Sequence, residues 1–161
     1  MNLDALGNIG EFVGSLGVVV SLIYLAVQVR QNTKSNYAAS VDRISSDLQE
    51  FTLGILRDEK TNRLLSTYIL NHTPAPDISE QDQFDVGVIL LAAFMVLWRA
   101  YDKNKRGQVE GDAWNTVLTL FRNAYFPSPV VNEWFSGPQA ALFPDDFRQF
   151  VSEEMKNISA V

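Results

Sequence analysis

The chain has 161 residues, a net charge of −6, no cysteine and a single histidine. The length allows one domain and an anchor, and the negative charge argues against a nucleic-acid binder, which needs a basic face. The absence of cysteine excludes disulfides and thiol nucleophiles, and one imidazole excludes metal sites that need two or more.

The most apolar stretch near the N-terminus is Phe12–Val29, which holds no charged residue. As a helix it would rise about 27 Å, close to the roughly 30 Å hydrocarbon core of a bilayer. A cleaved secretory signal needs a basic start and a small-residue cleavage site, and this segment has neither. We therefore predict a retained membrane-spanning helix over about residues 10–29; the alternative is a buried helix of a soluble domain.

The charges that flank this stretch predict its orientation. No lysine or arginine precedes it, whereas Arg30, Lys34 and Arg43 follow it. Basic residues concentrate on the cytoplasmic side of membrane helices. We therefore expect residues 1–30 to form a single-pass anchor with the N-terminus outside, and residues 31–161 to form a cytoplasmic domain.

Small and polar residues recur along the predicted span at intervals of four and three. They define the helix-association face, which consists of Gly10, Gly14, Gly17, Ser21, Tyr24 and Gln28. Small residues four apart let two membrane helices approach closely, and an amide on the same face can bond across the contact. The face predicts self-association or docking onto another membrane protein, although glycine is also common in membrane helices in general.

The rest of the sequence predicts helices only. A second apolar stripe follows the span without an intervening proline or glycine, so the anchor can continue as one helix to about Leu56; the stripe is Tyr37, Val41, Ile44, Leu48, Phe51 and Ile55. Further helices are expected at Asp58–Asn71, from Ser79 onward, at Asp112–Tyr125, at Val130–Phe135 and from Asp145 or Asp146. No convincing strand pattern occurs, so the predicted fold is all-α, a long N-terminal helix followed by a small bundle.

A second apolar run, Val86–Trp98, is thirteen residues long and bracketed by Asp85 and Arg99. It would rise only about 20 Å as a helix, too little to cross a bilayer comfortably. A helix that is apolar all round is typical of the centre of a bundle. We expect a core helix here, and a second membrane span is the alternative.

No catalytic, cofactor-binding or metal-binding residues are predicted. Asp102–Ala113 copies part of a calcium loop, but Arg106 and Ala113 occupy positions that need oxygen ligands. His72 has no partner motif, and the acids Glu80, Asp82 and Asp85 suit the first turn of a helix. The small basic cluster, Lys103, Lys105 and Arg106, is expected to be a solvated turn; contact with anionic lipid headgroups is the alternative.

Two segments are similar to a known family. Glu11-Phe-Val-Gly followed by the segment from Val18 to Thr33 resembles the N-terminal signature of a family of small uncharacterised bacterial membrane proteins. The pair Trp134-Phe135 and the segment from Phe143 to Val151 are similar too, with Phe135 where the family pattern has a second tryptophan. The resemblance implies a bacterial inner-membrane protein and implies no activity.

The leading hypothesis is a non-catalytic, membrane-anchored helical protein. It would work through helix–helix association in the bilayer, as a self-assembling scaffold or as an accessory subunit of a larger membrane complex. The alternative is a tethered domain that binds or senses a small molecule, for which a cavity among Phe94, Trp98, Trp114 and Phe121 would be expected. An enzyme would need converging polar residues, which the sequence does not show.

Overall fold

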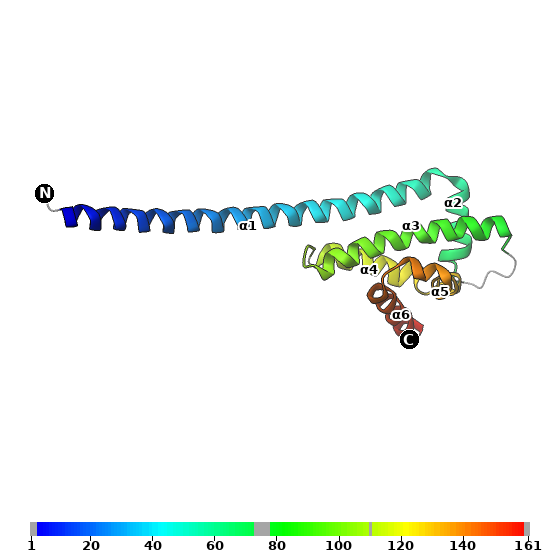
Figure 1. The fold of residues 1–161 in the computed structure, drawn as a ribbon. Helices are drawn as coiled ribbons and strands as arrows, with labels where there is room; N and C mark the ends of the chain where they lie inside the picture. The colour runs from blue at the N-terminus through cyan, green and yellow to red at the C-terminus, as the bar shows by residue number, and fades with distance from the viewer. Residues whose placement is uncertain (1–2, 73–77, 110, 160–161) are drawn as a thin grey trace. The chain divides into compact units, whose positions relative to one another are not determined.

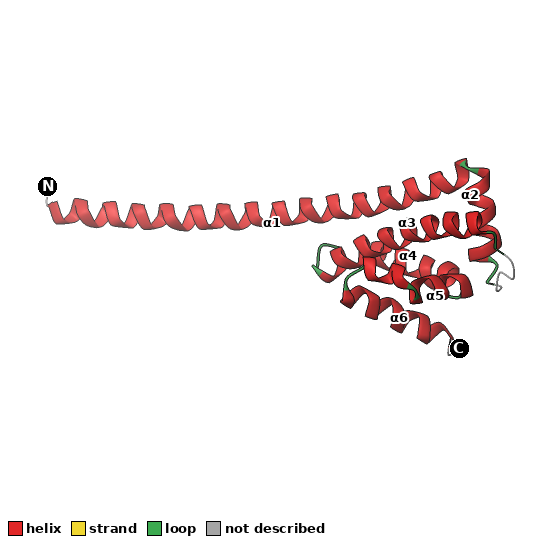
Figure 2. Ribbon diagram, turned by 45° about the vertical axis from the view of Figure 1, so that its right-hand side comes forward, coloured by secondary structure: helices red, strands yellow, loops and turns green. Residues whose placement is uncertain are grey.

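The computed structural model describes residues 3–72, 78–109 and 111–159. Within these ranges the chain forms six α-helices, two π-helical segments and one 3₁₀ helix, with no strand (Figure 2). The predicted all-α fold, a long first helix followed by a helical bundle, is thus confirmed.

Helix α1 runs without a break over Leu3–Arg57, 55 residues in all. The apolar stretch and the later amphipathic stripe therefore belong to one helix. The polar residues between them contain no helix breaker, and Thr33 bonds its hydroxyl to the Val29 carbonyl at 2.9 Å within the helix. The first proline of the sequence is Pro74, so nothing in this region forces a turn.

The chain divides into two compact units, Met1–Ala39 and Ser40–Val161. The second unit contains the end of α1 and every later helix, drawn from cyan to red in Figure 1. In chain order these are α2 (Glu59–Leu64), η1 (Leu65–Leu70), α3 (Glu80–Lys105), α4 (Asp112–Leu120), η2 (Phe121–Tyr125), α5 (Pro129–Ser136), η3 (Pro138–Leu142) and α6 (Asp145–Ser159).

Local chemistry explains where these helices start and stop. Asp58 caps α2 by accepting a 2.9 Å hydrogen bond from the Thr61 amide, and Ser79 caps α3 by accepting one of 3.1 Å from the Asp82 amide. Both side chains satisfy amides that a helix start leaves without partners. Between α3 and α4, Gly107 and Gly111 adopt positive φ angles of 66° and 54°, which glycine tolerates without a Cβ clash.

Helix α3 is the central helix of the second unit. In both ribbon views it runs between residues 40–57 of α1 on one side and α4, α5 and α6 on the other (Figures 1 and 2). Seven of its residues are buried: Val86, Ile89, Leu90, Ala93, Phe94, Leu97 and Ala100. These buried residues confirm the expectation of a core helix at Val86–Trp98.

Aromatic side chains fill the core around α3. The fully buried Phe94 ring stacks on Phe135 with 4.7 Å between ring centroids, and it meets Phe121 edge-on at 5.6 Å. Tyr101 stacks on Phe150 of α6 at 4.9 Å. Tyr125 is buried in the same region, and this burial raises the pKa of its phenol. These rings join α3, η2, α5 and α6 into one core.

Candidate functional site

The helix-association face lies along the first unit of the chain. At about 100° per residue, its six positions fall within an arc of about 80° on α1. Gly14, Gly17, Ser21, Tyr24 and Gln28 are all exposed. Gly10 lies on α1 but outside the residues whose surroundings the structure describes. The predicted residues therefore share one face, and the structure neither adds to nor removes any of them.

The glycines on this face are not required by packing within the chain. A Cβ added at Gly14 or at Gly17 would meet no atom within 4 Å. A glycine inside a helix costs about 0.8–1.0 kcal/mol relative to alanine. Two such glycines weaken α1 without an intramolecular reason, and a close approach by another helix would supply one.

Ser21 is suited to an apolar environment. Its hydroxyl donates a 2.8 Å hydrogen bond to the Gly17 carbonyl one turn earlier, and Ser15 makes the same contact with the Glu11 carbonyl at 2.8 Å. A hydroxyl bonded within its own helix leaves no unmet donor, which lowers the cost of placing it in lipid. The two serines of the stretch are thus compatible with a bilayer.

The remaining surface of the stretch is large and apolar. Nine such side chains between Leu16 and Val29 lie off the association face, and each is at least 48% exposed. They cover the arc of α1 that the association face leaves free. Contiguous exposed apolar surface of this extent marks a binding or membrane-contacting region. Over Gly14–Arg57, α1 is long and apolar enough to cross a membrane, and no residue of its most apolar window is buried.

Helix α3 also satisfies the length and composition of a membrane span. Of its most apolar window, however, 39% is buried in the bundle. The exposed side of α3 carries Phe84 and Val88 one turn apart. Among the residues that the structure describes, length and apolarity alone therefore select two helices, and the buried share of each helix distinguishes them.

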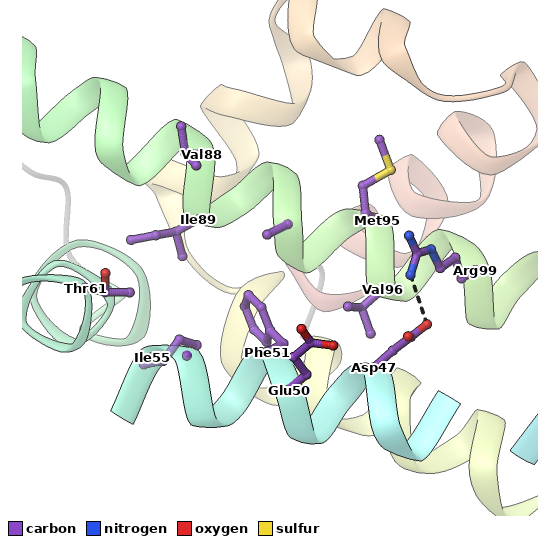
Figure 3. A pocket seen from close by; sticks show the side chains of 12 residues that line it. Asp47, Glu50, Phe51, Ile55, Thr61, Val88, Ile89, Met95, Val96 and Arg99 are labelled. Carbon is purple, nitrogen blue, oxygen red and sulfur yellow. Dashed lines mark hydrogen bonds and ion pairs between the residues drawn. The ribbon is translucent and has the colours of Figure 1, made fainter. Parts of the chain in front are cut away.

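An apolar groove lies between the end of α1 and α3, with a volume of about 440 Å³ (Figure 3). Phe51 and Ile55 of α1 face Ile89 and Val96 of α3 across it. At one end Arg99 Nη1 donates to Asp47 Oδ2 at 3.2 Å, an ion pair that ties the two helices together. The sequence does not predict this groove. The one signal for it in the sequence is Gly54, a helical glycine next to Ile55 of the amphipathic stripe.

Two of the three acids singled out at the start of α3, Asp82 and Asp85, are engaged in ion pairs within the bundle. Lys60 of α2 bonds to Asp85, and this contact holds the pKa of the Asp85 carboxyl below its ordinary value. Arg63 lies 3.9 Å from Asp82. Glu80 lies in the first turn of α3, where an acid suits the helix dipole. The acids at the start of α3 thus help attach α2 to α3.

The basic cluster is tied to its surroundings in the same way. Lys105 bonds to Asp146 of α6, and Arg106 Nε lies 2.9 Å from Asp102 Oδ2 one turn away. Lys103 Nζ lies 3.5 Å from the Ser40 carbonyl. Asp102 belongs to the last turns of α3, so the part of the calcium-like segment that the structure describes begins as helix rather than as a ligand loop.

His72 has a structural contact. Its Nε2 lies 3.1 Å from the Ala124 carbonyl in η2, and its backbone has a positive φ of 52°. A ring nitrogen that donates here satisfies a carbonyl near the end of the helix formed by α4 and η2. Within residues 3–72, 78–109 and 111–159, no three histidine or acidic side chains are grouped so as to hold a metal ion.

The four aromatic residues suggested for a ligand cavity are in contact with other aromatic rings. Phe94 and Phe121 are in edge-on ring contact and almost fully buried, and Trp98 and Trp114 contact Phe143 and Phe150. None of the four lines the groove.

No family model, curated protein or solved structure matches this chain. The functional argument therefore rests on its own residues. Two features stand out: the exposed apolar surface of α1 with its small-residue face, and the groove beside α3.

Proposed function

We propose that the protein is a single-pass protein of the bacterial inner membrane that acts through helix–helix association. Its span is the part of α1 from about residue 10 to residue 29, and its helical bundle serves as a cytoplasmic scaffold or docking domain. The partner of the span is a second copy or another integral membrane protein, and no chemical reaction is assigned to the chain.

One observation carries this proposal: the large apolar side chains from Leu16 to Val29 are exposed along α1. Burying apolar area stabilises by about 25 cal/mol per Å², so these side chains favour a lipid environment strongly over water. The length of the stretch fits the hydrocarbon core. Its resemblance to the signature of small bacterial membrane proteins is in keeping with this environment.

Orientation follows from charge. Arg30, Lys34 and Arg43 follow the span, and no basic residue precedes it. Retention of these cations on the cytoplasmic side would hold the bundle there. The acids Asp4 and Glu11 stand on the outer side, where they contribute little to topology.

Association is attributed to the small-residue arc. Gly14 and Gly17 leave open space beside the helix, whereas the opposite side of α1 carries branched and bulky residues that suit lipid tails. Backbones can approach closely only on the side without large side chains. Gln28 on the same face can add a hydrogen bond across the contact, worth about 0.6 kcal/mol in a membrane.

The test is a pair of matched double variants isolated from native membranes in mild detergent. Gly14→Leu with Gly17→Leu fills the association face, and Ser15→Leu with Ala26→Leu places two leucines on the other side of α1 as the control. The wild-type chain and the second variant should elute in an assembly larger than the 18.1 kDa monomer. The glycine variant should elute as the monomer; an unchanged assembly would refute association through this face.

A further inference from the structure

The groove beside α3 has the size and lining of a small-molecule site. Its volume of about 440 Å³ lies within the range of about 300–1,000 Å³ that drug-sized ligands occupy. Apolar side chains from two helices form its walls, chiefly Phe51 and Ile55 of α1 and Ile89 and Val96 of α3. A bound helix of several turns would need more room than this, so the volume favours a small molecule.

The groove is lined by more acidic than basic side chains. Three ionisable side chains line it: Asp47, Glu50 and Arg99. Arg99 is engaged by Asp47 at 3.2 Å. No hydrogen bond or ion pair to the Glu50 carboxylate occurs within the part of the chain that the structure describes, and Figure 3 shows this carboxylate directed from α1 into the space facing α3. The groove therefore presents one uncompensated negative charge beside apolar walls.

Gly54 keeps the groove open on the α1 side. It lines the groove in the middle of a helical turn, where glycine is the least favourable residue after proline. A Cβ at this position would meet no atom within 4 Å, so packing within the chain does not require the missing side chain. Any larger residue here would project into the space that a ligand would use.

We propose that this groove binds a small organic cation with an apolar body, an alkyl- or arylammonium compound. The ammonium group pairs with Glu50 and lies near the Phe51 ring, whose face attracts cations. The apolar body lies against Ile55, Ile89 and Val96. An anionic ligand of the same shape is disfavoured because Glu50 repels it and Asp47 already neutralises Arg99.

The test uses the full chain in lipid nanodiscs and three probes that share one apolar body: 4-phenylbutylammonium, 4-phenylbutanol and 4-phenylbutyrate. Binding is measured by titration calorimetry at pH 7, with empty nanodiscs subtracted. The cation should bind about two- to fivefold more tightly than the alcohol, the range expected for one exposed charge pair, and the anion should bind most weakly. Equal binding of all three probes would overturn the assignment of a cation.

Three variants locate the site. Gly54→Leu fills the groove and should abolish binding of the cation while the helical circular dichroism is retained. Glu50→Gln should reduce its affinity to that of the alcohol, and Glu133→Gln, which changes an exposed acid on α5, should leave it unchanged. Full binding by Gly54→Leu overturns the proposal. The proposal is also overturned if Gly54→Leu changes the mass of the assembly and leaves binding of the probes unaltered. That result would show that a second copy of the chain covers the groove.

Discussion

Two helices in the described part of the chain are long and apolar enough to cross a membrane, and they differ in what surrounds them. In α1 no residue of the most apolar window is buried, whereas in α3 the buried share is 39%. Leu90, Phe94 and Leu97 of α3 are buried in a core of aromatic rings, whereas residues of α1 such as Leu22 and Ile23 are exposed. The same composition thus serves a protein core in one helix and fits a bilayer in the other.

The flanking charges account for part of this difference. Only thirteen residues separate Asp85 from Arg99 on α3, and both form ion pairs within the bundle, with Lys60 and Asp47. Charged groups this close would have to enter the hydrocarbon core if α3 crossed it, at a cost of several kcal/mol. The stretch in α1 has no such limit, because eighteen residues separate Glu11 from Arg30.

The largest expected effect is on the core of α3. Phe94→Ala removes a fully buried ring that contacts five other aromatic rings and should lower the free energy of unfolding by about 3–5 kcal/mol. Leu22→Ala, a truncation on the exposed stretch of α1, should change it by less than about 0.5 kcal/mol. Urea unfolding of the purified chain followed by circular dichroism measures both. Equal losses would erase the distinction between the two helices.

An arginine placed in each apolar run should affect membrane binding in the opposite order: the substitution in α1 should have the larger effect. Val20→Arg puts a charge near the centre of the predicted span, where insertion costs about 2.5–3.5 kcal/mol, so the membrane-bound fraction should fall. Val88→Arg adds the same charge to the exposed side of α3 and should leave that fraction unchanged. Carbonate extraction of membranes followed by immunoblotting gives the comparison. Release of the α3 variant instead would make α3 a second span.

The smallest expected effect is the pH dependence of the bundle. Hydrogen bonds from Lys60 and Lys105 lower the pKa values of Asp85 and Asp146, so these carboxylates stabilise the fold above about pH 4 and lose this contribution as the pH falls through their lowered pKa values. Both pairs are exposed, so the effect should be modest and weaker in high salt.

Urea midpoints at pH 7, 4 and 3 test this dependence. Asp85→Asn should flatten the acid decline of the wild-type chain, and identical slopes for the two proteins would contradict the assigned role of the Lys60–Asp85 pair. The same pairs raise the pKa values of the lysines, so their contribution is present below about pH 10 and is lost as the pH rises through those raised values.

Much of the fold follows from local signals in the sequence. Asp58 and Ser79 cap helices at the positions where the sequence predicts helices to begin. Gly107 and Gly111 mark the turn between α3 and α4. The unbroken α1 follows from the absence of proline and glycine between the span and the amphipathic stripe. The 3₁₀ helix at Pro138–Leu142 was not predicted, because Gly137 and Pro138 indicate only a break.

The candidate sites were predictable to different degrees. Positions on one helix share a face by spacing alone, so the association face needs only the sequence. The groove depends on the distance between two helices that are far apart in the sequence, and no spacing rule gives that distance. Leu120 is a second feature that spacing alone does not give. It lies three residues after the buried Val117, so helical spacing predicts burial, but it is 38% exposed.

The central claim is that α1 crosses the bilayer once, with its N-terminus outside. The chain has no cysteine, so single-cysteine variants report on one site each. In intact spheroplasts, a membrane-impermeant maleimide should label Asn8→Cys at once and should label Ser136→Cys, on the exposed end of α5, only after lysis. Labelling of both before lysis, or of neither, would contradict a single span in this orientation.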